Sequence, residues 1–236
     1  MSRTYLQKAY SPLKKALPPV LSRWLRSVST AVITPIRFSY ATGHFRSSIK
    51  NVSVNKNGEF IPWYSYPAID FIINKDFSDK RVLEFGAGQS SLWWGKKAKY
   101  IKSFEEDLTW YTQLKTKITT NIELVYANLE PFENCLKVIN DNLVNDQKYD
   151  IIIIDGLYRY ELCEVAINNL AEGGVIIADN SEGTGYNFQR AFKNTGFSRV
   201  DFHGFSPGVV LRQGTSFFFK DSSFIFSNDS PIDLIL

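Results

Sequence analysis

The sequence predicts an α/β fold, a doubly wound and mostly parallel sheet with a helical N-terminal extension. From residue 81 onward, short apolar runs alternate with segments of helical periodicity, which is typical of consecutive βαβ units. Residues 150–155 (DIIIID) are an unbroken β-branched run, which indicates a strand buried on both faces of a parallel sheet. Two late strand-like segments without a helix between them indicate an antiparallel hairpin at the sheet edge.

Apolar runs and turn residues place the elements of this domain in order. The expected strands cover residues 81–85, 100–104, 122–127, 150–155, 175–178, 198–205 and 216–220. The expected helices cover residues 90–98, 108–118, 132–144, 160–171 and 186–194. Gly173 and Gly174 stand where a C-cap would close the helix over 160–171, and Gly196 follows the last helix.

Charge divides the 236-residue chain near residue 58. Residues 1–58 hold ten Lys and Arg and no Asp or Glu. The rest of the chain holds the other 17 basic residues and all 24 acidic residues, a net charge of −7. We therefore expect a basic helical extension over residues 1–58 and an α/β domain over residues 59–236.

Residues 12–38 of the extension have the pattern of a basic amphipathic helix. Pro18 and Pro19 suit its start and Pro35 its end. Apolar residues recur at helical spacing, with Arg23 and Arg26 on the other side: Leu21, Trp24, Leu25, Val28 and Val32. Such a helix lies on an anionic membrane surface or docks a partner, or else it packs on the domain with its charges solvated. We expect no nucleic acid partner, because no aromatic platform is interleaved with the charges.

Composition excludes several classes of site. Two cysteines, Cys135 and Cys163, are too few for a disulfide framework or an all-cysteine metal site. Two histidines make a multi-histidine zinc centre improbable. No apolar stretch of about 18 residues is present, and arginines interrupt the apolar part of the extension, unlike a secretory signal. We therefore expect a cytoplasmic protein that can contact a membrane peripherally.

Ligands of open α/β sheets bind beyond the carboxyl ends of the strands, so the residues that follow each strand are the candidates for a site. Residues 84–88 (EFGAG) follow the first strand, where glycines allow a tight turn and a close ligand. A dinucleotide fingerprint would place a third glycine at Ser91, which argues against NAD or FAD. Glu105 ends the second strand about twenty residues later, where a carboxylate can accept hydrogen bonds from a ribose diol.

Four segments together carry a resemblance to a known family. Residues 84–88 (EFGAG), 103–107 (SFEED), 154–156 (IDG) and 173–177 (GGVII) resemble, in this order, motifs of the class I S-adenosylmethionine-dependent methyltransferases. Residues 61–69 (IPWYSYPAI) also resemble a segment of a bacterial subgroup of that superfamily.

That resemblance covers residues 62–220 and implies both the details of the fold and a cofactor. It implies a seven-stranded sheet with a reversed last strand and S-adenosylmethionine as the cofactor. It also places Glu105 on the ribose and Asn128 near the adenine. The full set of cofactor-binding residues that it implies is Glu84, Gly86, Gly88, Glu105, Asn128 and Asp155.

Two motifs that the chain lacks exclude classes of methyl acceptor. Residues 155–158 (DGLY) lack the prolines of the tetrapeptide with which this superfamily methylates nucleobase amino groups. Cytosine C5 chemistry needs a nucleophilic cysteine, whereas Cys135 and Cys163 both fall in predicted helices. The polar and aromatic residues that follow the central strands suit a hydroxylated acceptor. We therefore expect O-methylation of a small-molecule or glycan hydroxyl.

Asp155, Asp179 and Asn180 end two strands that should be neighbours, so their oxygens would converge as Mg²⁺ ligands do. This set resembles the metal site of the catechol and caffeoyl-coenzyme A type O-methyltransferases, in which the metal lowers the pKa of the acceptor hydroxyl. Tyr158 stands where the catechol type has a lysine base, so the acceptor is activated differently here or the resemblance is partial. The alternative is that these are ordinary residues after strands, with no metal.

The remaining catalytic candidates surround the same edge of the sheet. Besides Asp155, they are Tyr158, Arg159 and His203, of which the histidine could act as a general base at neutral pH. Trp63 precedes the first helix of the domain and could belong to a lid. Two other functions stay open: an enzyme on the same fold such as an aminopropyl transferase, and a non-catalytic scaffold docked through the basic extension.

Overall fold

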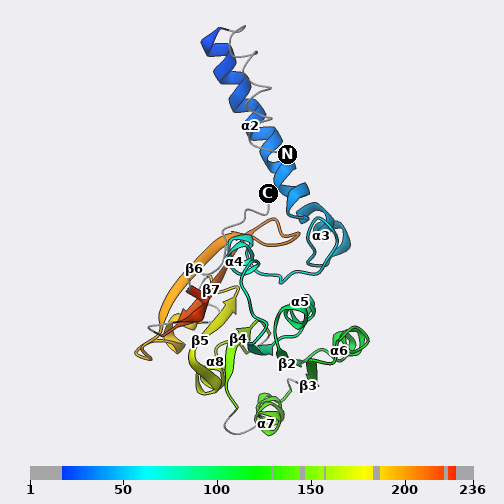
Figure 1. Ribbon diagram of the computed structural model, residues 1–236, viewed down its shortest axis with the longest axis vertical. Coiled ribbons are helices and arrows are strands. Elements are labelled where there is room, and N and C mark those ends of the chain that lie inside the picture. Colours follow the sequence, from blue (N-terminus) through cyan, green and yellow to red (C-terminus); the bar gives the residue numbers. More distant parts are fainter. Residues whose placement is uncertain are drawn as a thin grey trace.

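The computed structural model describes residues 18–226 except 129, 144–146, 157, 183–186 and 221–222. Within these residues a seven-stranded sheet carries helices on both faces, and a long N-terminal helix projects from this body (Figure 1). The predicted doubly wound α/β fold is confirmed. Residues 12–17 of the predicted N-terminal helix lie outside the described residues.

The sheet has the strand order β3-β2-β1-β4-β5-β7-β6, in which β7 runs antiparallel to both of its neighbours. The strands are β1 Arg81–Phe85, β2 Tyr100–Glu105, β3 Ile122–Tyr126, β4 Tyr149–Ile154, β5 Leu170–Asp179, β6 Ser198–Phe205 and β7 Arg212–Phe219. The direction of winding reverses between β1 and β4, which pair in parallel. The carboxyl ends of these two strands therefore form the topological switch point at which such sheets bind ligands.

One apolar core lies on each face of the sheet. The helices that cover the faces are α4 Tyr66–Ile72, α5 Gln89–Lys97, α6 Leu108–Lys115, α7 Phe132–Asn142, α8 Leu162–Asn169 and α9 Phe188–Ala191, whereas α3 His44–Lys50 lies beside the long N-terminal helix. Strand β4 serves both cores, because Ile151 and Ile153 belong to the core of α4 and α5, whereas Ile152 and Ile154 belong to that of α7 and α8. All four isoleucines are fully buried, which explains why this run lacks polar alternation.

The predicted boundaries around β5 and α9 were wrong. Gly173 and Gly174 lie inside β5 and cap no helix, because β5 already pairs with β4 at Leu170, ahead of a register shift in the ladder. Helix α9 is a single turn where nine residues were predicted. Asn187 precedes it with a left-handed φ of +54°, a conformation through which a right-handed helix cannot extend. Tyr186, the first residue of that predicted helix, lies outside the described residues.

Helix α2 (Pro19–Ala41) begins at the predicted prolines but continues past Pro35, so the predicted end was wrong. A proline costs a helix one hydrogen bond and can bend it without ending it. The C-terminal part of α2 meets the domain, where the Phe38 ring packs edge-on against Tyr66 at 5.2 Å between centroids. The division of the chain at residue 58 stays a prediction. None of the described helices is long and apolar enough to cross a membrane.

Candidate functional site

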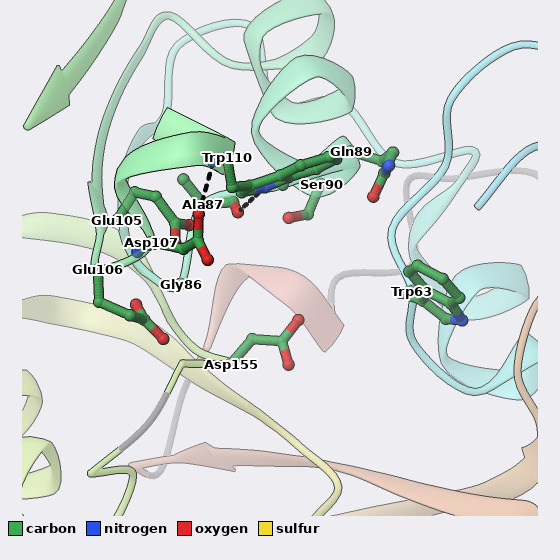
Figure 2. A pocket seen from close by; sticks show the side chains of 11 residues that line it. Trp63, Gly86, Ala87, Gln89, Ser90, Glu105, Glu106, Asp107, Trp110 and Asp155 are labelled. Atoms are coloured by element: carbon green, nitrogen blue, oxygen red, sulfur yellow. Dashed lines mark hydrogen bonds between the residues drawn. The ribbon is translucent and has the colours of Figure 1, made fainter. Parts of the chain in front are cut away.

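A pocket of about 360 Å³ opens at the carboxyl end of the sheet, at the switch point between β1 and β4 (Figure 2). Its walls are the loop over residues 86–90, the acidic turn over residues 105–107, Trp110 of α6, Asp155 after β4 and Trp63 before α4. Figure 2 shows Asp155 below the opening, with the acidic turn on one side and Trp63 on the other. The structure thus brings four of the predicted site residues into one cavity: Gly86, Gly88, Glu105 and Asp155.

Glycine is needed for different reasons at the two glycine positions of the loop. Gly86 has a φ of +95°, and a Cβ there would lie 2.5 Å from the amide nitrogen of Gly156. Gly86 is therefore needed for the shape of the backbone and for the close approach of the β1 and β4 ends. Gly88 is extended, and the nearest atom to a Cβ there would be Ser90 Oγ at an ordinary 3.7 Å. Gly88 is therefore needed only if a ligand lies against it.

Glu84 lies beneath this loop and outside the pocket lining. Its fully buried carboxylate accepts hydrogen bonds from the hydroxyls of Ser90 at 2.5 Å, of Ser103 at 2.6 Å and of Ser91. The Ser91 oxygen in turn accepts the Gly88 amide at 2.9 Å. Burial raises the pKa of Glu84 to about 7, against the effect of the three hydroxyl donors. This predicted cofactor residue thus holds the loop and the first turn of α5 in place.

Glu105 ends β2 with its carboxylate in the pocket and only 5% of the residue exposed. One oxygen, Oε1, accepts the Asp107 amide at 2.8 Å. Burial raises the pKa of Glu105 to about 8, and the neighbouring charge of Glu106 adds to the rise. A buried carboxylate of this kind is stabilised in its charged form by a ligand that donates hydrogen bonds, as a vicinal diol does.

Trp110 is a pocket residue that the sequence analysis missed. Its indole Nε1 donates to the Ala87 carbonyl oxygen at 2.9 Å, and its amide donates to Asp107 Oδ1 at 2.7 Å. The first bond ties α6 to the glycine loop, and the second caps the N-terminus of α6. An aspartate three residues before Trp110 was the available signal, because it is a favoured N-cap at that spacing.

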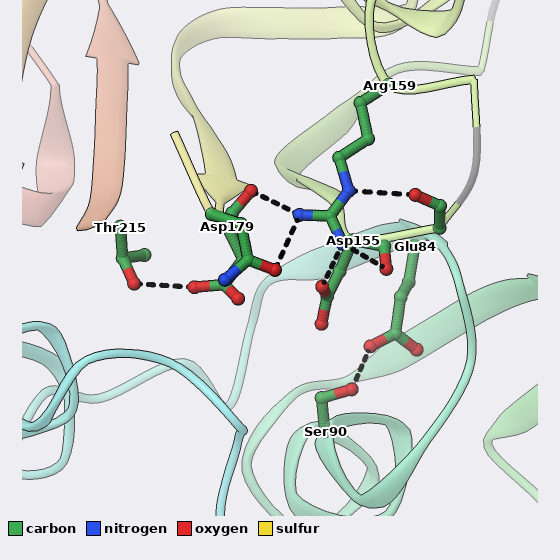
Figure 3. Close-up of polar contacts among 8 residues, drawn as sticks. Glu84, Ser90, Asp155, Arg159, Asp179 and Thr215 are labelled. Carbon is green, nitrogen blue, oxygen red and sulfur yellow. Dashed lines mark hydrogen bonds and ion pairs between the residues drawn. The ribbon is translucent and has the colours of Figure 1, made fainter. Parts of the chain in front are cut away.

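Arg159 joins the carboxyl ends of β4 and β5 (Figure 3). Its Nη2 donates to Asp155 Oδ1 at 3.1 Å, and its Nη1 donates to Asn180 Oδ1 at 3.1 Å and to the Asp179 backbone carbonyl. The Asp179 carboxylate accepts the Thr215 hydroxyl of β7 at 2.6 Å. These contacts link three adjacent strands, and the Arg159 side chain is only 8% exposed.

The three predicted metal ligands, Asp155, Asp179 and Asn180, are therefore gathered around a guanidinium. Burial raises the pKa of Asp155 to about 6 while Arg159 opposes that rise, and burial followed by the Asp155 charge raises the pKa of Asp179. Within the described residues no group of three or more His, Cys, Asp and Glu side chains is placed to hold a metal ion. The donor set fits the cation that it already contains, so the structure gives no support to the Mg²⁺ prediction.

No family model and no curated protein matches the sequence. Among solved structures, the O-methyltransferase TomG from Streptomyces achromogenes, in complex with SAM, is 12% identical with a TM-score of 0.52, over 78% of this chain and 89% of its own. The tRNA (m1A58) methyltransferase TrmI from Aquifex aeolicus is 14% identical with a TM-score of 0.50, over 70% of this chain and 71% of its own.

This chain has the class I methyltransferase fold. The strand order and the reversed β7 agree with the resemblance in the sequence, which is thereby confirmed at the level of the fold. Identities of 12% and 14% establish no more than the fold, so the chemistry must be argued from the pocket.

Three other predicted site residues lie outside both the pocket and the contacts around Arg159. Tyr158 has a left-handed φ of +53° and packs its ring on Phe132 of α7 at 4.6 Å between centroids. His203 lies on β6 and lines another cavity of about 270 Å³ together with Glu182. Asn128 follows β3 and is exposed. Their predicted roles therefore have no geometric support from the pocket at the switch point.

Proposed function

We propose that this chain is an S-adenosylmethionine-dependent methyltransferase that acts on a hydroxyl oxygen of a small molecule or glycan. The observation that carries the proposal is the Glu105 carboxylate, buried in the same pocket as the open backbone of Gly88. The ribose diol of the cofactor would donate to Glu105, and the rest of the cofactor would lie along the loop over residues 86–90. TomG, an O-methyltransferase solved with SAM, supports this reading of the shared fold.

When bound, S-adenosylmethionine supplies an electrophilic methyl group on a sulfonium. The chain would supply alignment and a proton acceptor. Asp155 lines the pocket, with Oδ1 held by Arg159, and its other oxygen would accept the proton of the acceptor hydroxyl. A pKa of about 6 keeps Asp155 ionised, and thus able to act as a base, near neutral pH. In this transfer a carbon–oxygen bond would form as the carbon–sulfur bond breaks, and the proton of the acceptor hydroxyl would pass to Asp155.

Arg159 would position this base and balance its charge. It is a permanent cation, so it cannot take the proton itself. Trp63 lies across the pocket from the acidic turn (Figure 2) and offers an aromatic face to an acceptor ring or sugar. Tyr158 and His203 have no role in this proposed reaction, because neither residue lines the pocket. The buried free thiols of Cys135 and Cys163 agree with a reducing compartment such as the cytoplasm.

The test is thermal unfolding of the full chain with S-adenosylhomocysteine, followed by turnover assays with catechol and with glucose as acceptor probes. Ligand at about 100 times its dissociation constant stabilises a protein by roughly 2.7 kcal/mol, or about 5–10 °C in midpoint at this size. We expect this shift in the wild type and its loss in Glu105→Gln. No shift at saturating ligand would overturn the proposal and favour a non-catalytic scaffold.

Aminopropyl transfer is a second candidate, favoured by the acidity of the pocket. Four acidic side chains line it, and those that are ionised would repel the methionyl carboxylate of S-adenosylmethionine: Glu105, Glu106, Asp107 and Asp155. Decarboxylated S-adenosylmethionine lacks that carboxylate. Calorimetric titration of both compounds separates the two reactions, since tighter binding of the decarboxylated form would favour aminopropyl transfer.

A further inference from the structure

Helix α2 projects away from the domain (Figure 1). It presents large apolar side chains to solvent. None of the residues Pro19–Ala41, all of which the structure describes, is buried. Val20 is 79% exposed, Trp24 60% and Ile36 65%. Soluble proteins rarely leave a contiguous apolar surface of this kind uncovered, so it indicates an interaction site.

Most of the apolar residues of α2 lie on a different face from its arginines. At 100° per residue, one face of the helix collects the residues Leu21, Trp24, Leu25, Val28, Val32 and Ile36. The arginines Arg23, Arg26 and Arg37 fall together on the opposite side. All three are exposed, and so are most of the apolar residues. The helix is therefore amphipathic and basic along 23 residues.

We propose that α2 binds an anionic membrane surface, lying in the interface with its apolar face toward the acyl chains. The helix is too polar to cross a bilayer, in agreement with the absence of a spanning helix among the described residues. A basic amphipathic helix of low net hydrophobicity lies on the membrane, with its apolar face buried at the headgroup boundary. Anionic headgroups attract its cations at the same time.

Charge favours this partner over a second copy of the chain. Residues 1–58 carry ten basic residues and no acidic one. Two α2 helices packed through their apolar faces would cover those faces but leave the arginines without partners, because neither helix holds a carboxylate. An anionic lipid surface offers both an apolar phase and negative charge, so it complements both faces of α2.

The C-terminal end of α2 lies near the carboxyl ends of the parallel strands, which is also where the pocket opens. Phe38 packs against Tyr66, and its ring lies 6.4 Å from that of Phe205 at the end of β6. Strand β6 runs parallel to β5, because both pair antiparallel with β7, so Phe205 marks the carboxyl edge of the sheet. Membrane docking through α2 would therefore hold this edge near the lipid surface. The docking itself does not depend on the proposed enzymatic function.

The test is sedimentation of the full chain with vesicles of phosphatidylcholine alone or with about one-quarter phosphatidylglycerol. We expect the wild type to bind the anionic vesicles and to be released by salt. Replacing Arg23, Arg26 and Arg37 by Gln should weaken binding roughly 100-fold, since each cation near such a surface contributes about 1 kcal/mol. The matched control replaces Lys117, Lys137 and Lys193, exposed lysines of the domain, by Gln.

A second variant tests the apolar face, with Trp24, Val28 and Val32 all changed to Ser. Because these side chains are exposed, the variant should unfold at the wild-type temperature while losing vesicle binding. Equal binding to neutral vesicles, full binding by either α2 variant, or loss of binding in the lysine control would overturn the proposal. A dimer that forms without lipid and is broken by the serine variant would assign the face to a second copy instead.

Discussion

Gly86 and Gly156 approach so closely that a Cβ on Gly86 would lie 2.5 Å from the Gly156 amide nitrogen. The two residues follow β1 and β4, so their contact fixes the loops on either side of the switch point. Gly88 lies two residues further along the same loop and has no such neighbour at its Cβ position, where the nearest atom is 3.7 Å away. The structural and ligand-binding requirements of this loop can therefore be separated by substitution.

Gly86→Ala should destabilise the fold by about 2–4 kcal/mol, because it adds a backbone clash to a positive φ. Gly88→Ala should leave the free energy of unfolding within about 1 kcal/mol of the wild type. It should weaken S-adenosylhomocysteine binding at least about tenfold, because its methyl group would occupy space in which the ligand lies. Denaturant unfolding and calorimetric titration measure the two effects. A Gly88→Ala variant that binds normally would show that no ligand lies against the loop.

Affinity for S-adenosylhomocysteine should increase with pH, because the ligand diol would require ionised Glu105. Burial raises the pKa of Glu105 to about 8, so below that pH most of the free protein must lose a proton before it binds. The association constant should therefore rise about tenfold between pH 7 and pH 9. Titration in buffers of different ionisation enthalpy should detect the released proton.

Glu105→Gln provides the control for that pH dependence. The variant should bind more weakly and with an affinity that no longer follows pH in this range. Glu133→Gln, an exposed change of equal charge on α7, should keep the wild-type profile. A wild-type profile that is flat from pH 7 to pH 9 would contradict the role given to Glu105.

Arg159→Met should destabilise the fold by about 3–5 kcal/mol, because it leaves the Asp155 carboxylate without its buried cation. Arg159→Lys keeps the charge but cannot span Asp155 and Asn180 with a planar fork, so its loss should be intermediate. The double variant with Asp155→Asn should recover part of the stability lost in Arg159→Met. Independent effects of the two substitutions in this double-mutant cycle would show that the ion pair contributes little.

The order of strands and helices could be predicted from the sequence because local patterns determine it. The apolar run over residues 150–155 must be a central strand, and β4 is one. The acid at Glu105 and the glycines after β1 could be placed in one site because parallel strands end at the same edge. Boundaries set by pairing could not be predicted, as the early start of β5 at Leu170 shows.

The contacts that Arg159 makes at the ends of β4 and β5 were harder to predict. Three oxygen-bearing side chains after adjacent strands indicate a cation, but they do not say which cation. In sequence Arg159 has the pattern of a solvated residue of an ordinary turn, and only tertiary structure shows that its guanidinium lies between Asp155 and Asn180. The direction of the Tyr158 ring likewise depends on a positive φ that no local pattern in a non-glycine residue predicts.

Neither Mg²⁺ nor EDTA should change the unfolding midpoint of the wild type, because the guanidinium of Arg159 already donates to Asp155 Oδ1 and Asn180 Oδ1. Arg159→Ala removes that cation and leaves Asp155, Asp179 and Asn180 together. Millimolar Mg²⁺ should then stabilise this variant relative to the same variant in EDTA. Stabilisation of the wild type by Mg²⁺ would show that the metal binds despite Arg159.

The free energy of unfolding should vary with pH because Glu84 titrates differently in the folded and unfolded states. Burial raises the pKa of this carboxyl from 4.5 to about 7, so between these values the folded state keeps a proton that the unfolded state has released. Stability from this group is therefore largest below about pH 4.5 and falls by about 3 kcal/mol as the pH rises to 7.

Glu84→Gln cannot titrate, so the difference between its stability and that of the wild type should change by that amount over this range. Glu172→Gln, an exposed change of equal charge, should run parallel to the wild type. Parallel curves for Glu84→Gln as well would mean that the three serine hydroxyls offset the burial and keep Glu84 ionised in the folded protein.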